Sequence, residues 1–283
     1  MRITVCELPH EPAALRVAWA GLCEHTAQHA SELVLLPECA FVPALWECHP
    51  FDYSRWEHAV QLSAAWLARL HELGVEHVVG TRPVEVGGRP CNQGYLWQPA
   101  CGVVPLRRKY FLPDEPGSWE AGWFDEGDPA FPVFRAGALS FGLNICTELW
   151  ALETYGDYAG KAQVVLSPRA TGADTRAKWL AAGVVAAVRS GAYSVSSNRV
   201  DQAGGCGGAS WVISPEGEVL VTTTPASPFA TVAVDLAAWE ETHTGYPRYV
   251  FARERRPQEP TLPAGAFHGE CRPVIEDDGI AIR

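Results

Sequence analysis

Short β-rich runs alternate with helix-length amphipathic stretches in the first part of the chain, and this order constrains the fold more than any other feature. The runs with strand character are RITVCEL, LVLLP and VEHVVGT, and helical stretches at about residues 13–30 and 55–73 separate them. Strand–helix–strand order of this kind is typical of βαβ units with parallel strands. The sequence therefore predicts an α/β fold.

The middle of the chain has a different pattern. Four β-rich runs are joined by Gly/Pro turns without a helix between them, at residues 93–98, 103–108, 131–135 and 139–146. Strands joined by short turns pair in antiparallel fashion, so the sheets are predicted to be mixed. The alternation then resumes with a helix, a strand, a helix and a strand, at residues 152–161, 163–167, 175–190 and 192–198. Two last strands meet at a turn of Pro215, Glu216 and Gly217, whose glycine can adopt a positive φ.

The chain contains no internal repeat and no Ser/Gly linker that would divide it into halves. We therefore predict one domain over residues 1–251. Residues 252–283 are rich in proline and charge, which predicts an extended tail. Such a tail either wraps a partner subunit or is mobile.

The composition excludes several classes of partner. With 47% hydrophobic residues in 283, the chain can bury a large core as one large domain or two small ones. The formal net charge of −11 argues against nucleic acid, which is bound through a basic surface. No run approaches the roughly 18 apolar residues of a membrane span, and the start lacks the pattern of a signal peptide. We expect a cytoplasmic protein that acts on a small molecule or a protein, without nucleic acid or membrane partners.

Nine cysteines are present, with no CxxC pair. The odd count and the spacing favour neither a disulfide framework nor a zinc ribbon, and we expect no metal site. Most of these thiols are expected to be buried, small apolar side chains in a reducing compartment.

Three chemically useful side chains stand at the ends of predicted strands. Cys146 ends LSFGLNIC ahead of a helical stretch, whose positive end would favour a thiolate, although a strand-end cysteine is often structural. Glu38 follows LVLLP and needs a partner if it is buried, or else caps the next segment. Lys109 ends VVPLRRK and is either a solvated edge residue or functional. The long loop that follows it favours function, because such loops inside a compact domain usually carry a role.

In this order and with these flanks, LVLLPE, LRRK and FGLNIC resemble the nitrilase superfamily of carbon–nitrogen hydrolases. The resemblance covers roughly residues 1–236. It implies a four-layer α-β-β-α sandwich, commonly paired across a dimer face, so a homodimer or higher homo-oligomer is expected. It also implies Cys146 as nucleophile, Lys109 as oxyanion partner and Glu38 as proton shuttle, with no cofactor.

The loop KYFLPDEPGSWEAGWF is similar to the lysine loop of N-carbamoyl amine amidohydrolases and related amidases. Glu120 is the match to a second carboxylate that would position the lysine and the substrate amide; otherwise it is an acid on a solvated loop. The resemblance implies hydrolysis of a small linear amide or N-carbamoyl (ureido) compound with release of ammonia. A nitrilase and a non-catalytic scaffold of the same fold are the alternatives. Thr147 and Phe111 replace an aromatic residue and a histidine common in the family, which leaves the substrate open.

Six further positions are expected to contact the substrate. The backbone N–H of Thr147 would complete the oxyanion hole with Lys109. Arg169 follows an apolar strand and would bind a substrate carboxylate or form a structural ion pair. The other four are aromatic residues that line the pocket or belong to the core, namely Phe41, Trp119, Trp150 and Trp179.

Overall fold

The computed structural model describes residues 1–201, 205–237, 239, 245–251, 274–276 and 279–281. The chain divides by its contacts into two units, residues 1–249 and 250–283. In the second unit, β13 (Val274–Glu276) and β14 (Gly279–Ala281) form an antiparallel pair. The rest of the predicted tail from residue 252 onward lies outside the described residues.

One half of the large sheet in the first unit has six strands in the order β12-β1-β2-β3-β4-β5. Strands β1, β2 and β3 are parallel, whereas β3, β4 and β5 form an antiparallel meander and β12 pairs antiparallel with β1. Their bounds are β1 (Arg2–Leu8), β2 (Leu33–Leu35), β3 (His77–Val86), β4 (Arg89–Gln98), β5 (Gly102–Arg108) and β12 (Phe229–Ala233). The predicted mixture of parallel and antiparallel pairing is confirmed.

The other half has the order β6-β7-β8-β9-β10-β11, with β7, β8 and β9 parallel. Its bounds are β6 (Phe134–Ala136), β7 (Leu139–Leu143), β8 (Val164–Arg169), β9 (Tyr193–Arg199), β10 (Trp211–Ile213) and β11 (Val219–Thr222). The last two residues of β1, Glu7 and Leu8, pair with Asn198 and Arg199 of β9. Strand β1 therefore joins both halves into one 12-stranded hydrogen-bonded sheet.

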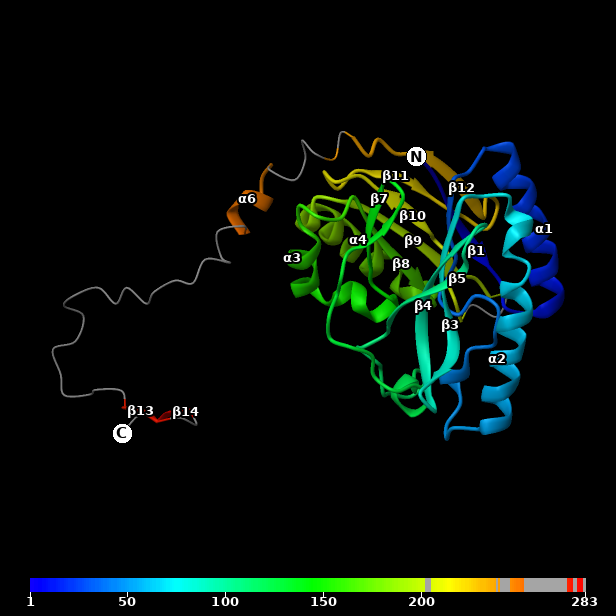
Figure 1. The fold of residues 1–283 in the computed structure, drawn as a ribbon, viewed down its shortest axis with the longest axis horizontal. Coiled ribbons are helices and arrows are strands. Elements are labelled where there is room, and N and C mark those ends of the chain that lie inside the picture. Colours follow the sequence, from blue (N-terminus) through cyan, green and yellow to red (C-terminus); the bar gives the residue numbers. More distant parts are fainter. Residues whose placement is uncertain (202–204, 238, 240–244, 252–273, 277–278, 282–283) are drawn as a thin grey trace. The chain divides into compact units, whose positions relative to one another are not determined.

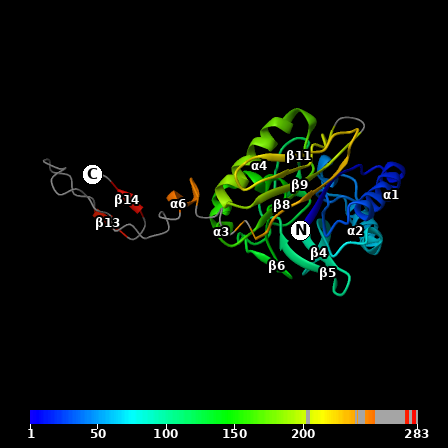
Figure 2. The ribbon, with the colours of Figure 1, turned by 90° about the horizontal axis from the view of Figure 1, so that it is seen from above.

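Helices cover the two outer sides of this folded sheet. Figures 1 and 2 show α1 and α2 side by side on one outer side and α3 and α4 on the opposite side. The helices are α1 (Pro12–Gln28), α2 (Tyr53–Leu67), α3 (Tyr155–Tyr158), α4 (Arg176–Ser190) and α6 (Arg248–Phe251). Short 3₁₀ helices span Leu45–Glu47, Leu70–Leu73, Glu120–Gly122, Cys146–Trp150, Leu152–Thr154 and Ala173–Thr175.

The helix ends carry the expected local signals. The Glu11 side chain accepts hydrogen bonds from the backbone N–H groups of Ala13 and Ala14 at the start of α1, where Pro12 is the first residue. Helix α4 ends at Gly191, which has the left-handed φ of +67° that glycine adopts without steric cost.

Three clusters of buried side chains define the layers. Ile3 and Val5 of β1 pack with Phe141 and Leu166 of the other half, so one cluster lies between the two halves of the sheet. The alternate residues of β1, Cys6 and Leu8, pack on α1 instead. A third cluster joins β8 and β10 to α3 and α4. Because side chains alternate along a strand, this arrangement gives the layer order helices, sheet, sheet, helices.

Two elements differ from the sequence prediction. The helix predicted over residues 152–161 was wrong in length: only Leu152–Thr154 and Tyr155–Tyr158 are helical. Glycines at 156 and 160 weaken a helix there, and Gly160 has a φ of +70°. The second difference is β12, which has no counterpart among the strands predicted from the sequence.

No helix among the described residues is long and apolar enough to cross a membrane.

Candidate active site

Loops after three strands bring an acid, a lysine and a thiol to one place. Glu38 follows β2, Lys109 directly follows β5, and Cys146 follows β7. The Lys109 Nζ donates to Glu38 Oε1 at 2.9 Å. Lys109 is fully buried and Glu38 is 1% exposed.

Glu120 completes the charged cluster. Both of its carboxylate oxygens accept from Lys109 Nζ, at 2.8 and 2.7 Å, and the residue is 3% exposed. One ammonium group therefore lies between two buried carboxylates. Burial alone would lower the pKa of Lys109, but the charges of Glu120 and Glu38 raise this pKa well above its ordinary value.

Burial raises the pKa of Glu120 from 4.5 to about 7, the Lys109 charge opposes the rise, and repulsion by Glu38 adds to it. Two like charges that share one cation cannot both be ionised at low cost in the interior. The cluster therefore takes up a proton near neutral pH.

Cys146 is 5% exposed and lies within electrostatic range of all three charged groups. Burial, reinforced by the charge of Glu38, raises the pKa of the Cys146 thiol well above its ordinary value; Lys109 and a hydrogen bond from the Ala170 backbone only partly oppose this. From the sequence, the positive end of a helix after Cys146 was expected to favour the thiolate. Instead, a short 3₁₀ helix begins at Cys146 itself, and burial outweighs its effect. The resting sulfur is a thiol that needs a base.

The backbone at Cys146 is strained. Its φ is +49°, in the left-handed region, and Cys39, which directly follows Glu38, has a φ of +44°. A residue with a side chain costs of order 1–3 kcal/mol in such a conformation and keeps it only when its surroundings enforce it. Strain of this kind is typical of functional sites.

Asn92 on β4 orients the Glu38 carboxylate. Its Nδ2 donates to Glu38 Oε1 at 2.8 Å, the same oxygen that accepts from Lys109. Within the described part of the chain, no hydrogen bond reaches Glu38 Oε2. The free oxygen is therefore the one that can exchange a proton with a neighbour. Sequence reasoning missed Asn92; its signal was an amide inside the otherwise β-rich run CNQGYLW.

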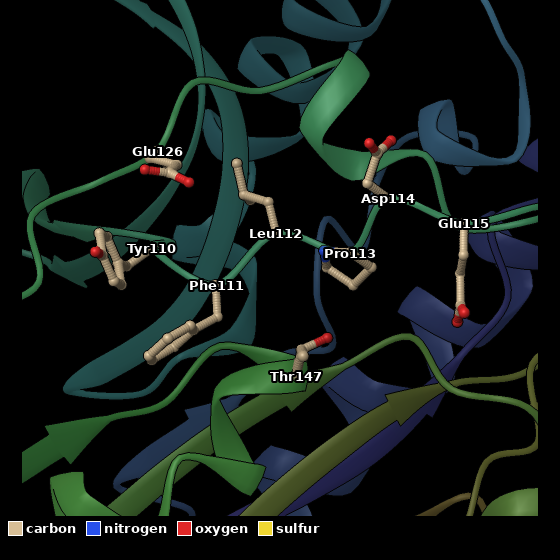
Figure 3. A pocket seen from close by; sticks show the side chains of 8 residues that line it. All are labelled: Tyr110, Phe111, Leu112, Pro113, Asp114, Glu115, Glu126 and Thr147. Atoms are coloured by element: carbon tan, nitrogen blue, oxygen red, sulfur yellow. The ribbon is translucent and has the colours of Figure 1, made fainter.

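A pocket of about 560 Å³ is lined by residues that follow Lys109 and Cys146 in the chain, although neither of these two side chains lines it (Figure 3). Its walls come from the loop that follows Lys109 and from Thr147, the residue after Cys146. The lining residues are Tyr110, Phe111, Leu112, Pro113, Asp114, Glu115, Glu126 and Thr147. Three of them are exposed carboxylates and none is a cation. A second cavity of about 250 Å³ shares two of these residues and is lined by Phe111, Thr147, Trp150, Ala151 and Glu153.

The structure separates the aromatic residues that were expected at the substrate. Trp150 lines the smaller cavity, and its ring lies 5.4 Å from that of Trp179. Trp119 packs partly buried, with its ring 4.8 Å from that of His49. Phe41 stacks on the Trp66 ring at 5.4 Å in the core under α1. This is a packing position, so we do not retain Phe41 as a substrate contact.

Arg169 lies among neutral groups of the protein. It is 1% exposed, and it donates to Ser196 Oγ at 2.6 Å, to Thr171 Oγ1 at 2.8 Å and to the Ala209 carbonyl at 2.8 Å. Its guanidinium also stacks 3.9 Å from the centre of the Trp211 ring. No carboxylate is among these partners, and the expected contact of Arg169 with a substrate carboxylate stays a prediction. Burial lowers its pKa to about 9.

In the part of the chain that the structure describes, no group of three or more His, Cys, Asp or Glu residues is placed to hold a metal ion.

Comparisons with known proteins agree with the fold. Residues 2–244 match the family model of the carbon-nitrogen hydrolases. Among solved structures, a carbon-nitrogen hydrolase from Helicobacter pylori has a TM-score of 0.78 at 20% identity, covering 90% of this chain and 95% of that one. A superfamily member from Xanthomonas campestris with an arsenic adduct in its active site has a TM-score of 0.72 at 18% identity, with coverage of 89% and 96%.

An amidase variant from Nesterenkonia sp., which shows Michael addition of acrylamide at its active-site cysteine, has a TM-score of 0.67 at 19% identity, covering 90% of this chain and 99% of that one. A search of curated protein sequences found no match. The fold is that of the nitrilase superfamily. Within it, the chain belongs to the carbon-nitrogen hydrolase family.

Proposed function

We propose that this protein is an amidase that hydrolyses a small linear amide or N-carbamoyl compound through a thioester on Cys146 and releases ammonia. The observation that carries the proposal is the buried ammonium of Lys109 between Glu38 and Glu120, within electrostatic range of the thiol. No packing role requires a lysine and two acids in the interior, where unpaired charges are costly. This argues against a non-catalytic scaffold.

In the first half of the reaction, Glu38 Oε2 takes the thiol proton and the sulfur attacks the amide carbon. A base is required because burial favours the neutral thiol. Negative charge develops on the carbonyl oxygen, and Lys109 Nζ and the Thr147 backbone N–H would stabilise it, at about 3 kcal/mol for each donor. The C–N bond then breaks, and Glu38 returns its proton to the nitrogen, which leaves as ammonia.

In the second half, water replaces ammonia beside the thioester. Glu38 takes a proton from the water as its oxygen attacks the thioester carbon, and the C–S bond breaks. The proton returns to the sulfur, which restores the thiol. With an N-carbamoyl substrate, the released carbamic acid decomposes to carbon dioxide and an amine.

The charge of the pocket narrows the proposed substrate. Asp114, Glu115 and Glu126 surround the cavity, and no cation, Arg169 included, is among its lining residues. Since an exposed ion pair contributes up to about 1 kcal/mol, each favourable contact would change KM by a factor of about five. We therefore propose a neutral or cationic substrate rather than a carboxylate-bearing one.

The solved amidase from Nesterenkonia sp. supports the choice of amides, because acrylamide and the acetamide moiety of fluoroacetamide add to its active-site cysteine. A nitrilase is the second candidate. It would use the same thiol, and the likeness of the loop that carries Glu120 to the lysine loop of amidases favours the amidase.

Ammonia release tests the proposal. The purified protein is offered matched small amides that end in a methyl, an ammonium or a carboxylate group, together with ureido compounds and nitriles. We expect turnover of amides or ureido compounds, least for the carboxylate series.

Cys146→Ala should abolish turnover in a folded protein, whereas Cys6→Ala, a change at another buried thiol, should not. Ammonia release that persists in Cys146→Ala would remove the thioester from the mechanism. Turnover of nitriles alone would select the second candidate.

A further inference from the structure

Glu148 lies two residues after Cys146 and has no part in the proposed proton transfers, yet it is fully buried. Its carboxylate accepts three hydrogen bonds. Oε1 accepts from the backbone N–H of Tyr110 at 2.7 Å, and Oε2 accepts from the backbone N–H of Ile145 at 2.8 Å. Oε2 also accepts from the Arg107 guanidinium.

These donors lie next to the two residues that matter most for the chemistry. Tyr110 directly follows Lys109, and Ile145 directly precedes Cys146. A single carboxylate therefore holds the segment that carries the lysine to the segment that carries the thiol. Charge-assisted hydrogen bonds to a carboxylate are short and about twice as strong as neutral ones.

The same residue also stabilises the turn at the nucleophile. The Glu148 backbone N–H donates to the Ile145 carbonyl at 3.1 Å, and its carbonyl accepts from Asn144 Nδ2 at 2.8 Å. Both ends of the turn around Cys146 are thereby fixed, and the left-handed φ of +49° at Cys146 is enforced from both sides.

Arg107 in turn holds the carboxylate in place. Its side chain is 3% exposed, and its guanidinium stacks 4.0 Å from the centre of the Phe131 ring. It also donates to the Ala130 carbonyl at 3.4 Å. A flat cation held between a ring and a carboxylate has little freedom to move.

We propose that Glu148, held by Arg107, is a positioning residue that sets the placement of the Cys146 thiol relative to Lys109 and so determines kcat. This inference rests on the proposed function, because it assigns the pair a role in that reaction. The substrate does not need to touch either side chain.

The test is Glu148→Gln. Glutamine has the same shape, but its NH₂ group must face Tyr110 N–H or the Ile145 and Arg107 donors, so one side of the link is lost. Because a misplacement of 1 Å can cost about 100-fold in rate, we expect kcat to fall by about that factor with KM changed less than about threefold. Iodoacetamide should also alkylate Cys146 about tenfold or more slowly, measured by peptide mass spectrometry.

Glu7→Gln is the matched control. Glu7 is 2% exposed and accepts from the Ala209 backbone N–H and the Thr223 hydroxyl, so its loss also breaks bonds to a buried carboxylate. If Glu148 only stabilises the fold, Glu148→Gln should behave like Glu7→Gln: its Tm should be lower, but its kcat and its labelling rate at Cys146 should equal those of the unmodified protein. That result would overturn the inference.

Two further outcomes are separable. If Glu148→Gln does not fold, Glu148→Asp is the second variant, because it keeps the charge but is one methylene too short to bridge both segments. A folded Glu148→Asp with unchanged kcat and unchanged labelling rate would equally overturn the inference. An unmodified protein that shows neither ammonia release nor selective labelling of Cys146 would contradict the proposed function itself, before any variant is compared.

Discussion

Replacing Glu120 with glutamine should move the acidic limb of the pH–activity profile to lower pH. In the unmodified protein, burial and the Glu38 charge raise the pKa of Glu120 to about 7, so the cluster holds an extra proton below that pH. A carboxylate pair that shares a proton is not free to accept one from the thiol. Activity should therefore rise as pH rises through about 7.

Burial is the largest cause of the raised pKa of Glu120, and repulsion by Glu38 across Lys109 adds to it. Glu38 and Glu120 oxygens lie 2.9 and 2.7 Å from Nζ. If the N–H bonds point along tetrahedral directions, the oxygens are about 4.6 Å apart, and two unit charges at that distance repel by about 3.6 kcal/mol at an effective dielectric constant of about 20. That energy corresponds to about 2.6 pH units. With Glu120→Gln the carboxyl whose pKa is about 7 is absent, and the acidic limb near pH 7 should disappear from the profile.

The assay is kcat/KM for ammonia release from pH 5 to 9. Between pH 5.5 and 8, a single proton with a pKa of about 7 gives a rise of about 30-fold, whereas the variant should rise less than about twofold. The absolute rate will fall because Lys109 loses a bidentate partner, so the shape of the profile is the readout. A variant whose acidic limb stays near pH 7 would refute the electrostatic coupling between the two acids.

Three further predictions concern chemistry, pH and packing. Glu38→Gln should lower kcat by about 10²- to 10⁴-fold, the usual contribution of a general base, and a kcat within tenfold of the unmodified value would exclude that role. Burial raises the pKa of Cys39 from 9.0 to about 12 and that of Cys146 well above 9.0, so the folded state binds more protons than the unfolded chain above about pH 9. The free energy of unfolding should therefore fall from pH 9 upward by about 1.4 kcal/mol per pH unit for each thiol, measured by urea unfolding; a flat profile would contradict this. Gly142→Ala would place a methyl group 2.6 Å from the Tyr158 ring, which should destabilise the fold by about 1–3 kcal/mol, and an unchanged Tm would show that the ring can move away.

Local patterns predicted most of the fold. The run RITVCEL is β1 from its first to its last residue, and the helix predicted at 175–190 is α4 within one residue. Strand β12 was missed because its residues are mostly half-buried and its partner β1 lies more than 220 residues earlier. Periodicity reports which face of a segment is apolar, but not which distant strand it will pair with.

The site was predictable to a similar extent. The family resemblance named Glu38, Lys109 and Cys146 together, and the loop resemblance added Glu120; in the structure Lys109 donates to both Glu38 and Glu120. The partners of Glu148 could not be predicted, because Tyr110 and Arg107 lie 38 and 41 residues away along the chain. Arg169 also follows an apolar strand, and it donates to the hydroxyl groups of Ser196 and Thr171. The sequence alone does not distinguish such a side chain from one that faces a ligand.

The pairing of β1 with β12 also bears on how the protein is made. Met1 donates from its amino group to the Val234 carbonyl, and Arg2 lies opposite Ala233. At ribosomal speeds of about 5–20 residues per second, the segment around β12 is synthesised about 10–45 seconds after β1. During that interval one edge of a strongly apolar strand has no partner and can pair with a neighbouring nascent chain. Expression yield should therefore respond to chaperones that shield this edge while translation continues.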